Sequence, residues 1–199
     1  GNFTGHVPTL IVQQILDPVC YLHNKLILVH HNLQPENLLC ISDAEDSPLV
    51  LADFDIAKEL KTPDDYLTSA AGSMGYCAPE VLFGNGHGRP CDIWSLGVIT
   101  YTLLAGYSPF RAENVNDFLQ EVDNDPPVIF HKDHWQHISD DAKDFIVRAC
   151  TVDQTKRATA DQLLHHPWLV DSDQYENADL LPQIKKFNAK KKFRQAVEL

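Results

Sequence analysis

The stretch that decides the fold is VHHNLQPENLL, residues 29–39. It is polar in the middle and apolar at both ends, which is typical of a loop between two buried segments. The short apolar run Leu26–Val29 before it predicts a strand. After it, Leu38–Ile41 and Leu49–Ala52 bracket a polar segment, which indicates a hairpin-like pair of strands. We therefore expect a polar loop held between short strands.

Most of the remaining chain predicts helices. Residues 7–26 have apolar side chains at helical spacing, and Pro18 could kink or break that helix. Asp92–Ala105 is apolar on nearly all sides, which predicts a buried central helix that stops at Gly106. Shorter helices are expected at Asn114–Val122, Ser139–Cys150 and Thr159–Leu164, and a basic helix at residues 181–199. Asp53–Pro79 predicts a long polar loop, and such loops usually serve a function.

The composition limits the class of protein. The chain has 199 residues, of which 44% are hydrophobic, and this suits one compact domain with a core. No apolar run reaches membrane-spanning length, so we expect no membrane partner. The 5 cysteines are widely spaced and form no CxxC pair, which indicates reduced thiols. We expect a cytoplasmic protein, with the nucleus as the alternative.

The charge is unevenly distributed. The whole chain carries −12, but residues 185–199 hold six basic side chains and one acidic one, which gives +5 there and leaves −17 for the rest. An acidic body disfavours nucleic acid as a partner. The basic end is expected to dock on the body or on an acidic partner.

Four motifs follow one another in a fixed order. They are HHNLQPEN at residues 30–37, DFD at 53–55, APE at 78–80 and DIWSLG at 92–97. Their order and spacing resemble the C-terminal lobe of a eukaryotic protein kinase. GYSPFRAEN at 106–114 and the basic end are similar, more narrowly, to the calcium/calmodulin-dependent Ser/Thr kinases, with a fungal character.

The resemblance implies a mainly helical, protein-kinase-like fold. Residues 1–169 would form the C-terminal lobe, with two to four short β-strands around the catalytic loop. Residues 170–199 would form a linker and a basic regulatory helix. The N-terminal β lobe, with its Gly-rich loop, strand Lys and helix Glu, is absent from this chain. An upstream first lobe stays open as an expectation.

The catalytic loop departs from the family pattern at its chemical positions. Asn32 stands where the family has the catalytic Asp, and an amide cannot take up a proton at neutral pH. Gln34 stands where a Lys steadies the transferring phosphate, and it cannot offset negative charge. His31 replaces the Arg that pairs with a phosphorylated activation loop. Asp55 replaces the Gly of DFG, which restricts the backbone and adds a charge beside Asp53.

Other positions match the family. Asp53 and Asn37 match its two metal ligands, so the resemblance implies a residual site for ATP and Mg²⁺, which could have been lost. His30 and Phe54 match packing residues of the same site, and Asp92 matches the anchor of the loop backbone.

Two further positions match parts of the family's activation segment. Glu80 and Arg157 match a buried ion pair that ties the activation segment to the helical base. Ser69 is a candidate phosphorylation site, although Ser is common in loops of this kind.

The basic end resembles a regulatory helix that calmodulin would bind through residues 180–199. Phe187, Phe193 and Val197 are candidate anchors, although the two Phe side chains do not share one helical face. A solvated basic helix is the simpler alternative.

Three functions stay open from the sequence. The first is a pseudokinase-like binding or scaffolding module that is inactive or impaired. The second is a working ATP-dependent Ser/Thr kinase with an atypical active site and a first lobe upstream. The third is a calmodulin-binding interaction protein without a nucleotide role.

Overall fold

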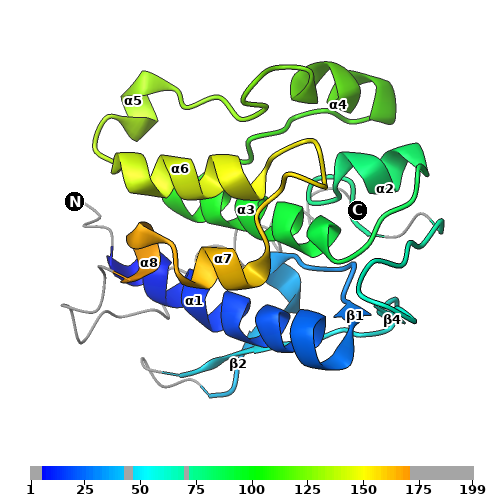
Figure 1. The fold of residues 1–199 in the computed structure, drawn as a ribbon. Coiled ribbons are helices and arrows are strands. Elements are labelled where there is room, and N and C mark those ends of the chain that lie inside the picture. The colour runs from blue at the N-terminus through cyan, green and yellow to red at the C-terminus, as the bar shows by residue number, and fades with distance from the viewer. Residues whose placement is uncertain (1–5, 43–46, 70–71, 171–199) are drawn as a thin grey trace, which may run out of the picture.

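The computed structural model describes residues 6–42, 47–69 and 72–170. These residues form a stack of helices with short strands along one side (Figure 1). The first helix, α1 (His6–Tyr21), lies beside α7 (Ala160–Leu164) and α8 (Pro167–Val170). Above them lie α3 (Pro90–Ala105) and α6 (Asp140–Ala149). The expected mainly helical fold is confirmed.

The first helix continues through Pro18 without a break. The change comes later, where a π-helical turn, η1 (Leu22–Leu26), follows Tyr21. It ends at Ile27, which has a left-handed φ of 51°. That conformation is strained for a β-branched residue, and it turns the chain sharply into the first strand.

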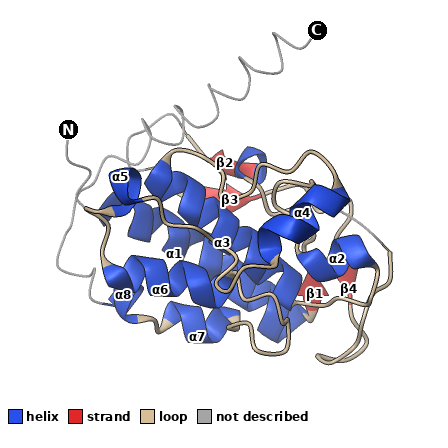
Figure 2. Ribbon diagram, turned by 90° about the horizontal axis from the view of Figure 1, so that it is seen from above, coloured by secondary structure: helices blue, strands red, loops and turns tan. Residues whose placement is uncertain are grey.

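The strands form two separate antiparallel pairs at the margin of the helical body (Figure 2). The expected hairpin is confirmed as β2 (Leu38–Cys40) paired with β3 (Leu49–Leu51), with Leu39 opposite Val50. The expected strand at Leu26–Val29 is shorter, β1 (Leu28–Val29). Its partner β4 (Lys58–Glu59) lies inside the segment expected to be loop.

The central helix α3 divides the core. One of its faces packs Ile93, Leu96 and Ile99 against α1 and α6. The other packs Trp94 and Val98 into an aromatic cluster, whose further members include Tyr101, Phe110, Phe118 and Trp135. The helix begins with Pro90 in its first turn and stops at Gly106, whose φ of 80° suits a helix end. The sequence predicted this helix correctly.

The remaining elements are short or amphipathic. The expected helices appear as α4 (Val115–Val122), capped by Asn114, and as α6, capped by Ser139. Three short helices were not expected: α2 (Pro79–Phe83), α5 (Lys132–Trp135) and α8. The 3-10 turn η2 (Pro35–Asn37) closes the polar loop.

Helices α3 and α6 approach closely at Gly97. A Cβ atom on this residue would lie 2.6 Å from the sulfur of Cys150 and 2.8 Å from Cβ of Ala149. Only glycine fits this contact without displacing a neighbour. The thiols of Cys77, Cys91 and Cys150 are buried.

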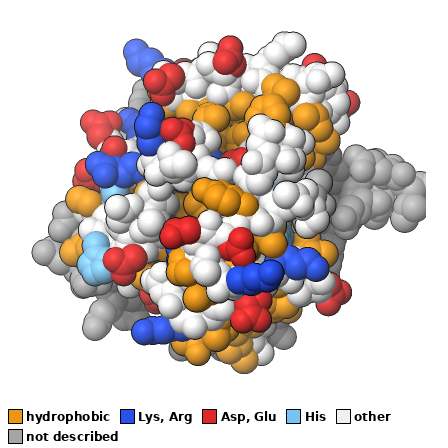
Figure 3. Space-filling view, turned by 45° about the vertical axis from the view of Figure 1, so that its right-hand side comes forward, with side chains coloured by type: hydrophobic (Ala, Val, Ile, Leu, Met, Phe, Trp, Pro, Cys, Tyr) orange, Lys and Arg blue, Asp and Glu red, His pale blue; other side chains and the backbone are white. Residues whose placement is uncertain are grey.

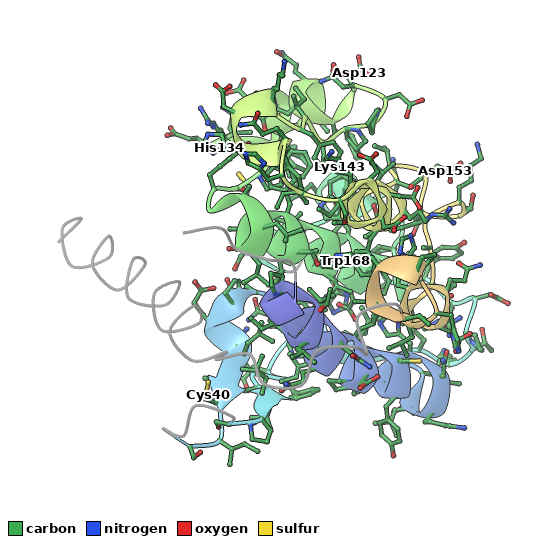
Figure 4. The ribbon with its side chains drawn as sticks, turned by 90° about the vertical axis from the view of Figure 1, so that its left-hand side faces the viewer. Cys40, Asp123, His134, Lys143, Asp153 and Trp168 are labelled. Carbon is green, nitrogen blue, oxygen red and sulfur yellow. The ribbon has the colours of Figure 1, made fainter. Side chains whose placement is uncertain are left out.

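The outer surface is of mixed character. On the face in Figure 3, basic side chains of the described residues lie next to acidic ones rather than forming one continuous basic surface. Cys40 on the hairpin and Asp123 after α4 lie at opposite ends of the molecule (Figure 4). Among the described residues, none of the helices is both long and apolar enough to cross a membrane.

Candidate active site

A buried carboxylate holds the loop that follows β1. Asp92 of α3 is fully buried and accepts hydrogen bonds from the backbone N–H groups of His30 (2.8 Å) and His31 (2.9 Å). His23 contacts the same carboxylate through Nε2 at 2.9 Å. Burial alone would raise the pKa of Asp92, but the contact with His23 and the two N–H donors outweigh it and lower the pKa. The loop is therefore fixed from the central helix.

His31 turns its side chain into the protein. The residue has a left-handed φ of 66° and is buried. Its Nδ1 lies 3.1 Å from the carbonyl oxygen of Ile56, and its Nε2 lies 2.9 Å from Nε2 of His87. Both ring nitrogens are engaged inside the fold, so this side chain is already occupied by contacts other than a phosphorylated loop.

The next residues form a chain of side-chain hydrogen bonds. Gln34 donates through Nε2 to Oδ1 of Asn32 at 2.9 Å, and Asn32 donates through Nδ2 to Oδ2 of Asp53 at 2.6 Å. Asn37 donates through Nδ2 to the backbone oxygen of Asn32 at 2.7 Å. The structure thus brings together four residues that the sequence singled out. They come from one loop and from the segment after β3.

His30 lies next to this series of hydrogen bonds. It is buried, and its Nε2 lies 3.1 Å from the carbonyl oxygen of Ala52. A carbonyl only accepts, so Nε2 carries the hydrogen, and Nδ1 is free to accept from the N–H of Asn32 at 3.2 Å. The ring also meets Phe54 edge-on at 4.7 Å between centroids. Burial lowers the pKa of His30, which favours this neutral form.

The segment after β3 presents Asp53 to the loop. Asp53 is exposed and has a left-handed φ of 65°. Asp55 is also exposed and lies in a turn closed by a 3.0 Å hydrogen bond from the N–H of Ala57 to the oxygen of Phe54. Among the described non-glycine residues of this turn, the left-handed one is Asp53 and not Asp55. An aspartate at position 55 therefore fits without backbone strain.

Glu80 of α2 and Arg157 form a bidentate buried ion pair. Nη1 donates to Oε1 at 2.5 Å and Nη2 donates to Oε2 at 2.9 Å. Arg157 also donates to the carbonyl oxygens of Pro90 at 2.9 Å and Thr151 at 2.8 Å. Its guanidinium lies 5.2 Å from the ring centroid of Trp94, which suits a cation–π contact. The pair joins two segments that are 77 positions apart.

Ser69 is exposed on the segment between β4 and α2. Two residues earlier, Leu67 forms a bridge with His87, with backbone hydrogen bonds of 2.8 and 2.9 Å. Phe187, Phe193 and Val197 lie outside the described residues, as does the whole segment 180–199.

Asp53 and Asn37 offer the oxygen ligands that Mg²⁺ prefers. The amide nitrogen of Asn37 is used in the loop, which leaves its side-chain oxygen as the ligand atom. One Asp53 oxygen accepts from Asn32. In the described part of the chain, no three His, Cys, Asp or Glu side chains gather as a complete metal site. The two residues thus fit part of a magnesium site.

A family model for the protein kinase domain matches residues 1–169. The chain belongs to the protein kinase family. Among similar kinases, the calcium/calmodulin-dependent protein kinase cmkA of Emericella nidulans is 49% identical over 199 residues, which is 100% of this chain and 47% of that relative. A calcium/calmodulin-dependent protein kinase of Metarhizium anisopliae is 45% identical over 199 residues, which is 100% of this chain and 51% of the relative.

A calcium/calmodulin-dependent protein kinase type 1 of Macrobrachium nipponense is 39% identical over 200 residues, covering 98% of this chain and 56% of the relative. The chain therefore spans about half the length of the curated kinases that it matches. It resembles the calcium/calmodulin-dependent kinases along its whole length.

Two contacts of the candidate site were missed from the sequence. His87 was not singled out, because its contact with His31 spans 56 positions and no motif marks it. His23 was not singled out either, although it lies on the turn that leads into the catalytic loop and contacts Asp92. A polar residue at an apolar helix position is the one sequence signal that could have marked His23.

Proposed function

We propose that this chain is a non-catalytic, pseudokinase-like binding or scaffolding module whose capacity for phosphoryl transfer is lost or strongly impaired. The observation that carries the proposal is the hydrogen-bond chain from Gln34 through Asn32 to Asp53. In this series of hydrogen bonds, the amide of Asn32 donates to the carboxylate of Asp53, which would hold the metal. The amide groups of Gln34 and Asn32 thus bond within the site instead of serving as a cation and a base.

The chemistry of phosphoryl transfer explains why these residues matter. The reaction depends on positioning and on neutralising charge. Asn32 cannot accept the proton of a substrate hydroxyl, and loss of a general base costs roughly 10²–10⁴ in rate. Gln34 cannot supply the positive charge of a Lys at the transferring phosphate. We therefore expect the two replacements together to leave little turnover.

ATP and Mg²⁺ belong to the proposal only as partial ligands. Asp53 and Asn37 supply two oxygen ligands, and the metal would neutralise phosphate charge when bound. Residues 1–199 do not contain the Gly-rich loop, the strand Lys or the helix Glu that grip the nucleotide. Binding of Mg-ATP by this chain alone should therefore be weak.

The test adds an N-terminal lobe to residues 1–199. The N-terminal lobe of the Emericella relative is fused to residues 1–199, and phosphoryl transfer from ATP to a basic peptide is measured. The matched variant carries Asn32→Asp and Gln34→Lys. We expect the restored variant to exceed the unmodified fusion by at least about a hundredfold, from the loss of the base alone. Turnover by the unmodified fusion within tenfold of the intact Emericella kinase would refute the proposal.

The second candidate is a working Ser/Thr kinase with an atypical site and a first lobe upstream. It is favoured by the 49% identity to a protein named as a kinase and by the retained Asp53 and Asn37. It predicts that restoring positions 32 and 34 changes turnover little. Phosphorylation of Ser69 would fit this candidate, since the side chain is exposed.

The third candidate is a calmodulin-binding protein without a nucleotide role. The names of the relatives and the basic residues 185–199 support it. It predicts calcium-dependent binding of a peptide spanning 180–199, with Phe187, Phe193 and Val197 as anchors. Stabilisation by Mg-ATP that disappears in Asp53→Ala would count against it.

The proposal includes a regulatory role for the end of the chain. We propose a kinase-like lobe at residues 1–169 and a linker with a basic regulatory helix at 170–199. The family match to residue 169 supports this boundary. A cytoplasmic or nuclear location and the absence of nucleic-acid partners are part of the same proposal.

A further inference from the structure

Two buried histidines meet outside the hydrogen-bond chain of the candidate active site. His31 of the catalytic loop and His87, just before α3, have their Nε2 atoms 2.9 Å apart. The rings cross nearly at right angles, with centroids 5.0 Å apart. His87 is 0% exposed and His31 6%. Such a short contact between two imidazoles needs one hydrogen between the nitrogens.

The positions of the hydrogens follow from the neighbours. The carbonyl oxygen of Ile56, 3.1 Å from Nδ1 of His31, can only accept, so Nδ1 carries a hydrogen. In neutral His31 the Nε2 atom then accepts, and His87 must donate through its own Nε2. This leaves Nδ1 of His87 without a hydrogen. That atom is buried and has no hydrogen-bond partner among the described residues.

Protonation acts on this pair in two steps. A first added proton keeps one hydrogen between the two Nε2 atoms, because either ring can still accept while the other donates. A second proton makes both Nε2 atoms donors and gives both rings a positive charge. Two donors cannot bond each other, and like charges repel in a buried site. The contact therefore survives one proton and breaks with two.

The contact links a segment of the chain to the catalytic loop, because the side chain of His87 contacts His31 and its backbone contacts Leu67. The backbone N–H of His87 donates to the carbonyl of Leu67 at 2.9 Å, and its carbonyl accepts from the N–H of Leu67 at 2.8 Å. Gly86 packs against Tyr66, where an added Cβ would lie 3.5 Å from Cβ and 3.7 Å from Cγ of the tyrosine. The side chain of His87 thus ties residues 61–69, which carry Ser69, to the catalytic loop.

Charged groups on two neighbouring helices act on the pair. Glu80 of α2 and Asp92 of α3 act on His87 and favour its charged form. Both are engaged already, Glu80 by Arg157 and Asp92 by the loop backbone and His23. Burial lowers the pKa of His87 and the neighbouring His31 lowers it further. His30, next to His31 in the same loop, is a further titratable neighbour, and its burial lowers its pKa.

We propose that the His31–His87 pair is an acid-sensitive latch that holds residues 61–69 against the catalytic loop and releases them when both imidazoles are protonated. The latch is independent of the proposed function, since it needs neither nucleotide nor catalysis. It is closed at neutral pH. Below about pH 6.5 the open form binds one more proton than the closed form, so opening becomes about tenfold more favourable per pH unit.

The first test reads the tautomers of the unmodified chain by ¹⁵N NMR of its histidine rings at pH 7.5. The expected result is a hydrogen on Nδ1 of His31 and on Nε2 of His87. The opposite assignment at His31, or two freely titrating rings, would overturn the latch. This measurement does not depend on whether any variant folds.

The second test uses hydrogen exchange between pH 7.5 and 5.5, corrected for the intrinsic pH dependence. Protection of the Leu67 amide, relative to that of Ile99 in α3, should fall about tenfold per pH unit below about pH 6.5. His87→Gln keeps a donor but cannot gain a proton, so it should abolish this fall. His137→Gln, at an exposed histidine after α5, should leave it unchanged. A ratio that does not depend on pH, or a fall that persists in His87→Gln, would refute the latch.

Discussion

The ion pair between Glu80 and Arg157 makes a sharp prediction about stability. The Arg157 side chain is 0% exposed and that of Glu80 is 7% exposed, so both charged groups are largely shielded from bulk water. Glu80→Gln keeps the size of the side chain but leaves a buried guanidinium without its counter-charge. Breaking one partner of a buried pair costs roughly 3–5 kcal/mol.

This cost is large for a domain of this size. Natural domains unfold with a free energy of roughly 5–15 kcal/mol, so Glu80→Gln, at roughly 3–5 kcal/mol, should remove about a fifth or more of the total. At about 2–4 °C per kcal/mol, the melting temperature should drop by roughly 6–20 °C. Arg157→Met should cost more, because the carbonyl oxygens of Pro90 and Thr151 also lose their donor.

Urea unfolding followed by circular dichroism measures these values in a double-mutant cycle. The double variant, Glu80→Gln with Arg157→Met, should cost less than the sum of the single variants, because the second change no longer strands a charge. The control is Asp140→Asn, which breaks the ion pair with Lys143, where Asp140 is 99% exposed. If Glu80→Gln is as harmless as the control, the pair is not what holds α2 to the helical base.

Three further predictions concern packing, pH and the candidate site. In a urea titration, Gly97→Ala should lower the free energy of unfolding by about 1–3 kcal/mol, because the added methyl group overpacks the contact between α3 and α6. Gly75→Ala is the control and should be nearly neutral, because no atom lies within 4 Å of the added Cβ. Burial lowers the pKa of His30, so the stability that neutral His30 contributes is complete above about pH 6.5 and is lost as the pH falls below that value. In urea titrations from pH 7.5 to 5.5, the free energy of unfolding should fall by at most about 1.4 kcal/mol per pH unit because of this group. A free energy of unfolding that does not change with pH would contradict this. Asn32→Asp replaces the amide that donates to Asp53 at 2.6 Å by a second carboxylate. The melting temperature of this variant should fall without metal and recover with Mg²⁺, whereas that of the unmodified chain should respond to Mg²⁺ much less. Equal responses of the two proteins would contradict the expected repulsion.

Much of the fold could be predicted because its signals are local. Residues 92–105 are apolar on nearly all sides and stop at a glycine, which marked α3. The polar interruption between Leu38–Ile41 and Leu49–Ala52 marked the hairpin. Strand β4 was missed, since two exposed residues become a strand only by pairing with β1. The short helices α2 and α5 were missed because five or four residues carry too little periodicity.

The candidate site divides in the same way. Asn32, Gln34, Asn37 and Asp53 were found through motifs, and the structure places them in one hydrogen-bond chain. The direction of those bonds could not be predicted, because it depends on how two separate segments meet. The contact of His31 with His87 was beyond reach for the same reason: the interpretation of His31 as a lost phosphate anchor did not say what the ring binds instead.

The contrast between buried and exposed polar residues explains why such a chain keeps its fold. Asp92 and the Glu80–Arg157 pair are buried, and each is bonded to partners that folding cannot leave unsatisfied. Asn32 is only half-buried, and its amide turns a repulsion between two carboxylates into a hydrogen bond with Asp53. An aspartate there would need a metal to stabilise it, whereas an asparagine does not. Selection for folding alone therefore retains Asp92 and the Glu80–Arg157 pair. It tolerates or even favours asparagine at position 32. The buried residues thus do not indicate whether the reaction is retained.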